Sequence, residues 1–148
     1  MSITPREAHV SALLWFIAVG AGVFETLLVI IEKLTDGSGL SGEIIVGVAV
    51  RLTVFMVATC LIVQMRNGRN WARLSLTVLL GVLGSASLLL GPISWFAAGH
   101  SLAEYFAGAQ AMSLLFAASR VIHIAAVFGG LLFMFRPKAN AYFRLAAQ

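Results

Sequence analysis

Four long apolar runs constrain this chain more than any other feature of its sequence. They lie at about Val10–Ile31, Ile44–Met65, Leu74–Trp95 and Met112–Phe135. An α-helix of roughly 20 apolar residues crosses the roughly 30 Å hydrocarbon core of a bilayer, and each run is long enough to do so. Only short polar segments separate the runs. The sequence therefore predicts an all-α polytopic membrane protein, with residues 1–148 forming a single four-transmembrane-helix bundle with short loops.

The composition excludes a water-soluble globular domain. Hydrophobic residues make up 60% of the chain and charged residues 11%, and the mean hydropathy is +0.97. Soluble domains carry about 25% charged residues. The formal net charge of +4 does not indicate a nucleic-acid partner, because the basic residues lie in short segments between apolar runs. We expect the lipid bilayer, and not nucleic acid, to surround this chain.

The basic residues predict the orientation in the membrane. Those outside the runs, except Lys33, all flank the same ends of the runs: Arg6, Arg66, Arg69, Arg73, Arg136, Lys138 and Arg144. Positively charged segments stay on the cytoplasmic side of a membrane. We therefore expect a multi-pass protein of the plasma (inner) membrane with both termini in the cytoplasm. The first run is too long for the core of a signal peptide, so we expect it to be retained as a helix.

Three ionisable residues lie deep within three different runs. Glu25, Arg51 and Arg120 each lie roughly 21–22 Å from the cytoplasmic end of their run. His123 follows Arg120 by one helical turn and shares its face. An ionised side chain at this depth costs about 2.5–3.5 kcal/mol on insertion scales. These four residues form the predicted intramembrane charge layer.

The charge layer has two interpretations from the sequence alone. In the first, it is a structural ion-pair network: Glu25 neutralises Arg51 or Arg120, and the other arginine extends towards lipid phosphates. In the second, two arginines and one glutamate form a net positive ligand pocket. Such a pocket would accept an anionic lipid headgroup, a small carboxylate or a phosphate, or would take part in proton-coupled movement.

Small residues and turn signals give further expectations. Ala18, Gly22 and Glu25 share one face of their run, which should turn Glu25 towards protein, because small faces let helices approach closely in lipid. Pro92 should end or kink the third run. The stretch Ser101–Glu104 has the spacing of a capping box, which begins either the fourth long helix or a short helix before it.

The sequence contains no nucleotide-binding glycine motif, no HExxH and no nucleophile elbow. The single cysteine, Cys60, excludes an intramolecular disulfide and a CxxC motif. The three histidines lie at different depths, so they cannot jointly bind one metal ion. We therefore expect no enzymatic activity, no metal and no cofactor. The first functional hypothesis is a small scaffold or accessory subunit, associating with itself or with a larger membrane complex. The alternative is a transporter or binder of a small molecule, an anion or a lipid.

Two cytoplasmic stretches carry a resemblance. The residues are Arg69, Asn70, Trp71, Ala72 and Arg73, and then Arg136, Pro137, Asn140, Ala141, Tyr142 and Phe143. Together they resemble small four-helix membrane proteins of actinobacteria that are mostly described as uncharacterised. The two stretches, residues 66–79 and 133–143, cover about a sixth of the chain. The resemblance implies an actinobacterial inner-membrane protein and brings no activity with it.

Overall fold

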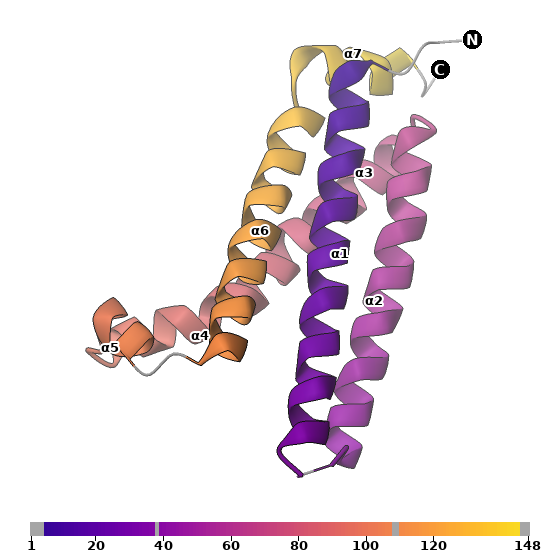
Figure 1. The fold of residues 1–148 in the computed structure, drawn as a ribbon. Helices are drawn as coiled ribbons and strands as arrows, with labels where there is room; N and C mark the ends of the chain where they lie inside the picture. Colours follow the sequence, from indigo (N-terminus) through magenta and orange to yellow (C-terminus); the bar gives the residue numbers. More distant parts are fainter. Residues whose placement is uncertain (1–4, 38, 108–109, 146–148) are drawn as a thin grey trace.

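The computed structural model describes residues 5–37, 39–107 and 110–145, which form helices and no strand (Figure 1). Four helical stretches are long and apolar enough to cross a membrane, and they span Arg6–Thr35, Gly42–Arg66, Asn70–Ala97 and Ala111–Met134. The predicted all-helical class and its four apolar helices are thus confirmed. The first three predicted runs lie inside these helices, and the fourth helix ends one residue before the predicted Phe135.

The most extensive helix contact joins α1 (Arg6–Thr35) to α6 (Ala111–Met134), and two adjacent glycines of α6 lie in it. A Cβ atom built on Gly130 would lie 3.1 Å from the fully buried ring of Trp15. A Cβ atom on Gly129 would lie 3.1 Å from the Leu14 side chain. Because the two glycines have no side chains, the backbones of α1 and α6 can lie close together. Leu14 and Trp15 of α1 pack directly against the glycines.

Two buried serine hydroxyls also join α1 to α6. Ser11 Oγ donates a hydrogen bond to the Gly130 carbonyl at 2.9 Å, and Ser119 Oγ donates one to the Ala21 carbonyl at 3.2 Å. Each buried hydroxyl thus has a hydrogen-bond acceptor on the backbone of the other helix. Such bonds require the close backbone approach that the glycines permit.

The third apolar helix packs against the others along only part of its length. Its first part, α3 (Asn70–Leu76), packs against α2 (Gly42–Arg66), while its last part, α4 (Ser85–Ala97), buries only Ser85. In Figure 1 the helix runs obliquely past the α1–α6 pair, and α4 diverges from α1 and α2. Between these parts lies a π-helix, η1 (Thr77–Gly84), which the sequence did not predict.

The predicted basic segments lie at one end of the molecule, where α7 (Pro137–Leu145) crosses the helix ends (Figure 1). The Tyr142 hydroxyl donates a hydrogen bond to the Arg66 carbonyl at 2.9 Å. The Arg73 guanidinium stacks over Phe135 and Phe143, 4.4 Å and 4.9 Å from their ring centroids. Several residues that carry the sequence resemblance thus hold the last helix against the ends of α2 and α3.

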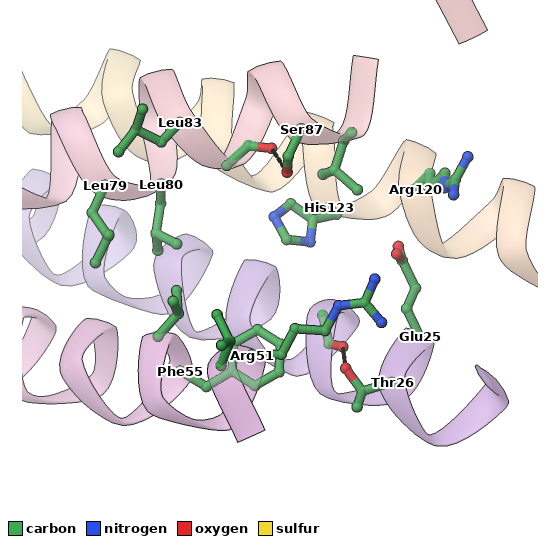
Figure 2. A pocket seen from close by; sticks show the side chains of 15 residues that line it. Glu25, Thr26, Arg51, Phe55, Leu79, Leu80, Leu83, Ser87, Arg120 and His123 are labelled. Atoms are coloured by element: carbon green, nitrogen blue, oxygen red, sulfur yellow. Dashed lines mark hydrogen bonds between the residues drawn. The ribbon is translucent and has the colours of Figure 1, made fainter. Parts of the chain in front are cut away.

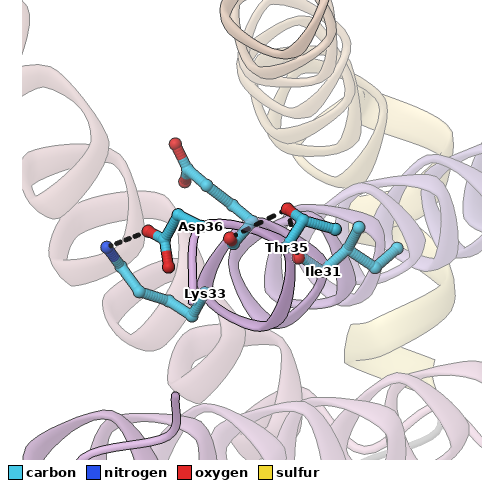
Figure 3. A network of polar contacts seen from close by, with 5 residues as sticks. Ile31, Lys33, Thr35 and Asp36 are labelled. Atoms are coloured by element: carbon cyan, nitrogen blue, oxygen red, sulfur yellow. Dashed lines mark hydrogen bonds and ion pairs between the residues drawn. The ribbon is translucent and has the colours of Figure 1, made fainter. Parts of the chain in front are cut away.

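Polar side chains cap the C-terminal end of α1, which lies at the end of the molecule away from α7 (Figure 1). At the end of α1, Thr35 Oγ1 donates to the carbonyls of Ile31 and Glu32, and Lys33 Nζ lies 3.1 Å from Asp36 Oδ2 (Figure 3). The Asp36 N–H also donates to the Glu32 carbonyl at 2.9 Å, so backbone and side-chain donors together satisfy the last turn of α1.

The predicted capping box begins a short helix, α5 (Leu102–Ala107), and not the fourth long helix. The Ser101 N–H donates to Glu104 Oε2 at 2.9 Å, and the Glu104 N–H donates to Ser101 Oγ at 3.2 Å. Of the two alternatives expected for Pro92, that it ends or that it kinks its helix, the first is wrong, because α4 continues to Ala97. A proline removes a single backbone donor, and this loss falls near the end of the helix, where few turns follow.

The α1–α6 contact yields a first prediction. Gly130→Leu should lower the free energy of unfolding by about 1–3 kcal/mol, because the added side chain meets the Trp15 ring. The measurement is unfolding of the purified chain in mixed micelles. Gly20→Leu is the matched control, since a Cβ at Gly20 meets no atom within 4 Å and leucine favours the helix. Equal stability of the two variants would contradict the proposed role of the contact.

Candidate functional site

A cavity of about 440 Å³ lies between α1, α2, η1, α4 and α6. All four residues of the predicted charge layer line it: Glu25, Arg51, Arg120 and His123 (Figure 2). They come from three helices that are distant in sequence, so the packing brings them together. The remaining wall is mainly apolar, with Val54, Phe55, Leu79, Leu80, Leu83 and Leu88.

Glu25 reaches the cavity from α1, and its carboxylate is half-buried. Arg120 exerts the largest electrostatic attraction on the carboxylate, Arg51 exerts a smaller one, and the Ser119 hydroxyl lies close to it. In Figure 2 the carboxylate lies between the two guanidinium groups. Glu25 Oε1 is inaccessible to solvent and has no hydrogen-bond partner among the described residues.

No ion pair within 4.0 Å joins Glu25 to either arginine. The ion pairs of the described residues join Lys33 to Asp36, His100 to Glu104, and Lys138 to Glu7, and none includes Glu25. Arg51 is exposed, while Arg120 is half-buried, with its Nε buried and lacking a described partner. Two cationic groups and one carboxylate therefore give the cavity a net positive charge when His123 is neutral.

His123 is the only buried ionisable residue among the described residues of the cavity, with 7% of its surface exposed. Neither ring nitrogen has a hydrogen-bond partner within the described part of the chain. Leaving a buried polar group without a partner costs about 1–3 kcal/mol. The imidazole of His123 thus offers a donor and an acceptor that nothing in the described protein uses.

Gly22 determines how closely the cavity wall approaches α1. A Cβ atom on Gly22 would lie 2.8 Å from the Phe55 ring and 3.6 Å from Cε1 of His123. A Cβ atom at this position would therefore displace the Phe55 ring, while it would only touch His123. The sequence grouped Gly22 with Glu25 on a small-residue face, but it contained no signal that Phe55 is the neighbour.

The hydroxyl groups of the cavity are already committed as donors. Thr26 Oγ1 donates to the Gly22 carbonyl and Ser87 Oγ to the Gly84 carbonyl, both at 2.9 Å (Figure 2). The uncommitted donors that face the cavity therefore come from the two arginines and the histidine. This set recognises negative charge rather than a neutral polar group.

The π-helix η1 contributes one whole wall of the cavity. Leu79, Leu80, Leu83 and Gly84 belong to it and line the site, and Ser85 Oγ bonds back to the Leu80 carbonyl, five residues earlier. A π-helix is rare, is usually a single turn, and is frequently found at functional sites. Sequence patterns at this position indicated an ordinary transmembrane helix, so this element was missed.

Comparisons of the chain with protein-family models, with curated proteins and with solved structures find no match. The resemblance to actinobacterial membrane proteins therefore stays a prediction, and the function has to be argued from the site.

The site geometry yields a second prediction, a comparison of two double-mutant cycles. Replacing Glu25 and Arg120 by glutamine, singly and together, should reveal a stabilising coupling of about 0.5–3 kcal/mol in the free energy of unfolding. The cycle of Glu25 with Arg51 should give a smaller coupling, because Arg51 attracts the carboxylate less. A coupling that is larger for Arg51, or absent from both cycles, would contradict this geometry.

Proposed function

We propose that this chain is a non-enzymatic, integral protein of the inner membrane that binds a monoanionic group in the cavity of the charge layer. The observation that carries the proposal is that Arg51, Arg120 and the unpartnered His123 border one cavity without pairing to Glu25. In this proposal both termini face the cytoplasm, so the cavity lies nearer the outer leaflet.

Charge balance indicates which anions the cavity prefers. Arg51 and Arg120 supply two positive charges and Glu25 one negative charge, which leaves one charge for a ligand to neutralise. Charges in hydrocarbon are costly unless they are compensated. A phosphodiester or a carboxylate, with one negative charge, fits this balance. Binding requires no cofactor and no metal in this proposal.

The third prediction tests anion binding with diethyl phosphate, a soluble phosphodiester. At about 100 times its Kd, it should stabilise the purified chain by about 2.7 kcal/mol relative to chloride at equal ionic strength. The measurement is the melting temperature in non-ionic detergent. Triethyl phosphate, which is neutral, should produce no shift.

Matched variants distinguish the cavity from the basic cytoplasmic surface. The double variant Arg51→Gln/Arg120→Gln should lose the shift, and Arg69→Gln, which changes an exposed arginine outside the cavity, should keep it. His123→Phe should weaken binding without lowering the stability of the ligand-free chain, because it removes an unpartnered polar ring. Equal shifts in all variants would show that the anion binds elsewhere.

A scaffold or accessory subunit is the second candidate function. It is favoured by α4, which leaves the bundle and buries only Ser85. In this candidate the exposed face of α4 packs against another transmembrane helix, with small residues supporting close approach.

The fourth prediction tests self-association through α4. In a Cys60→Ser background, Leu90→Cys should form disulfide-linked dimers when native membranes are treated with a thiol oxidant, because Leu90 is 66% exposed on α4. Ile45→Cys is the control, since Ile45 is 56% exposed on α2. If neither variant forms a crosslink, or both form it equally, self-association through α4 is rejected.

A further inference from the structure

A second cavity, of about 390 Å³, lies between α4 and α6 next to the charged one. Its wall is apolar, with Leu89, Pro92, Trp95 and Phe96 from α4 and Val121 and Ile124 from α6. Leu102 of α5 also lines it. Among the described lining residues, Arg120 is the only charged one. This cavity therefore has the chemistry to accommodate hydrocarbon beside a single positive charge.

The two cavities share two lining residues, Leu88 and Arg120. Arg120 thus stands where the charged space adjoins the apolar space, and its buried Nε has no partner among the described residues. A molecule whose charged group contacts Arg120 from the first cavity can extend an apolar part into the second. If each cavity held its own ligand, no arginine would need to line both cavities.

We infer that the ligand is a monoanionic amphiphile, with its phosphodiester or carboxylate group at Arg51, Arg120 and His123 and one hydrocarbon chain in the second cavity. This inference rests on the proposed function and adds the class of the ligand. Two independent observations point to an occupant of the first cavity. One is the excess of positive charge, and the other is the buried residue His123, 7% exposed, whose ring nitrogens have no hydrogen-bond partner among the described residues.

The exposure of the second cavity suits a ligand that enters from the bilayer. Gly91, Trp95, Phe96 and Val121 line it and are themselves exposed in the structure. In this inference lipid surrounds these residues, so a chain passes from the bilayer to the cavity without crossing water. Burying a hydrocarbon chain gains little when it leaves other hydrocarbon. The contacts of the headgroup therefore determine which lipid binds, and the shape of the second cavity determines where its hydrocarbon chain lies.

Trp95 provides a direct readout because it lines the second cavity. In a Trp71→Phe background, which removes an exposed tryptophan outside both cavities, the purified full chain is titrated in non-ionic detergent with phosphatidylglycerol carrying brominated acyl chains. Bromine quenches a tryptophan that it contacts. Brominated phosphatidylcholine is the comparison, since it carries no net charge. Subtracting the quenching of the Trp95→Phe variant isolates the signal of Trp95.

We expect phosphatidylglycerol to quench Trp95 at an about tenfold lower lipid fraction than phosphatidylcholine, the effect of one charge-assisted hydrogen bond. Gly91→Leu should abolish this preference by filling the second cavity, since a Cβ at Gly91 meets no atom within 4 Å. Gly47→Leu is the matched control, because Gly47 has the same open space and lines neither cavity. Ala117→Leu fills the second cavity from α6 and replaces Gly91→Leu if that variant does not fold.

The outcomes distinguish a failure of the amphiphile inference from a failure of the proposed anion site. If diethyl phosphate binding depends on Arg51 and Arg120 but Trp95 shows no preference for phosphatidylglycerol, the amphiphile is rejected and the anion site stands. If Gly91→Leu and Ala117→Leu leave the preference for phosphatidylglycerol unchanged, the hydrocarbon chain of the ligand does not lie in the second cavity. If neither diethyl phosphate nor phosphatidylglycerol binding depends on the two arginines, the proposed function itself fails.

Discussion

The close contact of α1 with α6 is the interaction on which the rest of this structure depends. In a bilayer, apolar surface gains nothing by leaving lipid for protein, so helices are held by backbone proximity and by buried hydrogen bonds. Gly129 and Gly130 permit that proximity, and Ser11 and Ser119 use it to bond across the interface. The same contact places Glu25 beside the turn of α6 that carries Arg120 and His123.

The second structural determinant is the irregular third helix. Its first turns pack on α2, but the π-helical stretch Thr77–Gly84 precedes the divergence of α4 from the bundle. If the third apolar helix were straight and packed along its whole length, its apolar side chains would fill the cavity that the charge layer borders. Proteins depart from regular geometry and from complete polar pairing mainly at functional sites. The π-helix, the unpartnered His123 and the open arrangement of Glu25 with two arginines coincide in one place, which is why binding is preferred to an ion-pair network.

Much of the fold could be predicted because it follows from one-dimensional patterns. The four apolar helices follow from length and hydropathy, and the grouping of Glu25, Arg51 and Arg120 follows from equal counts of residues along helices of constant rise. The role of Pro92 could not be predicted, because a proline's effect depends on whether neighbouring helices compensate for the missing donor. The second cavity was also missed, since Trp95 and Val121 line one space only through the way α4 and α6 cross.

The sequence by itself determined that this chain is helical, apolar enough to span a membrane, and charged at one depth in three helices. These properties are sums over single residues and fixed helical geometry, so they require no knowledge of packing. Only the tertiary structure decided that Glu25, Arg51, Arg120 and His123 border one cavity, that no ion pair joins Glu25 to either arginine, and that the ring nitrogens of His123 have no hydrogen-bond partner among the described residues. These relations depend on helix rotation and crossing, which side-chain packing sets to within a few ångströms and no local pattern encodes.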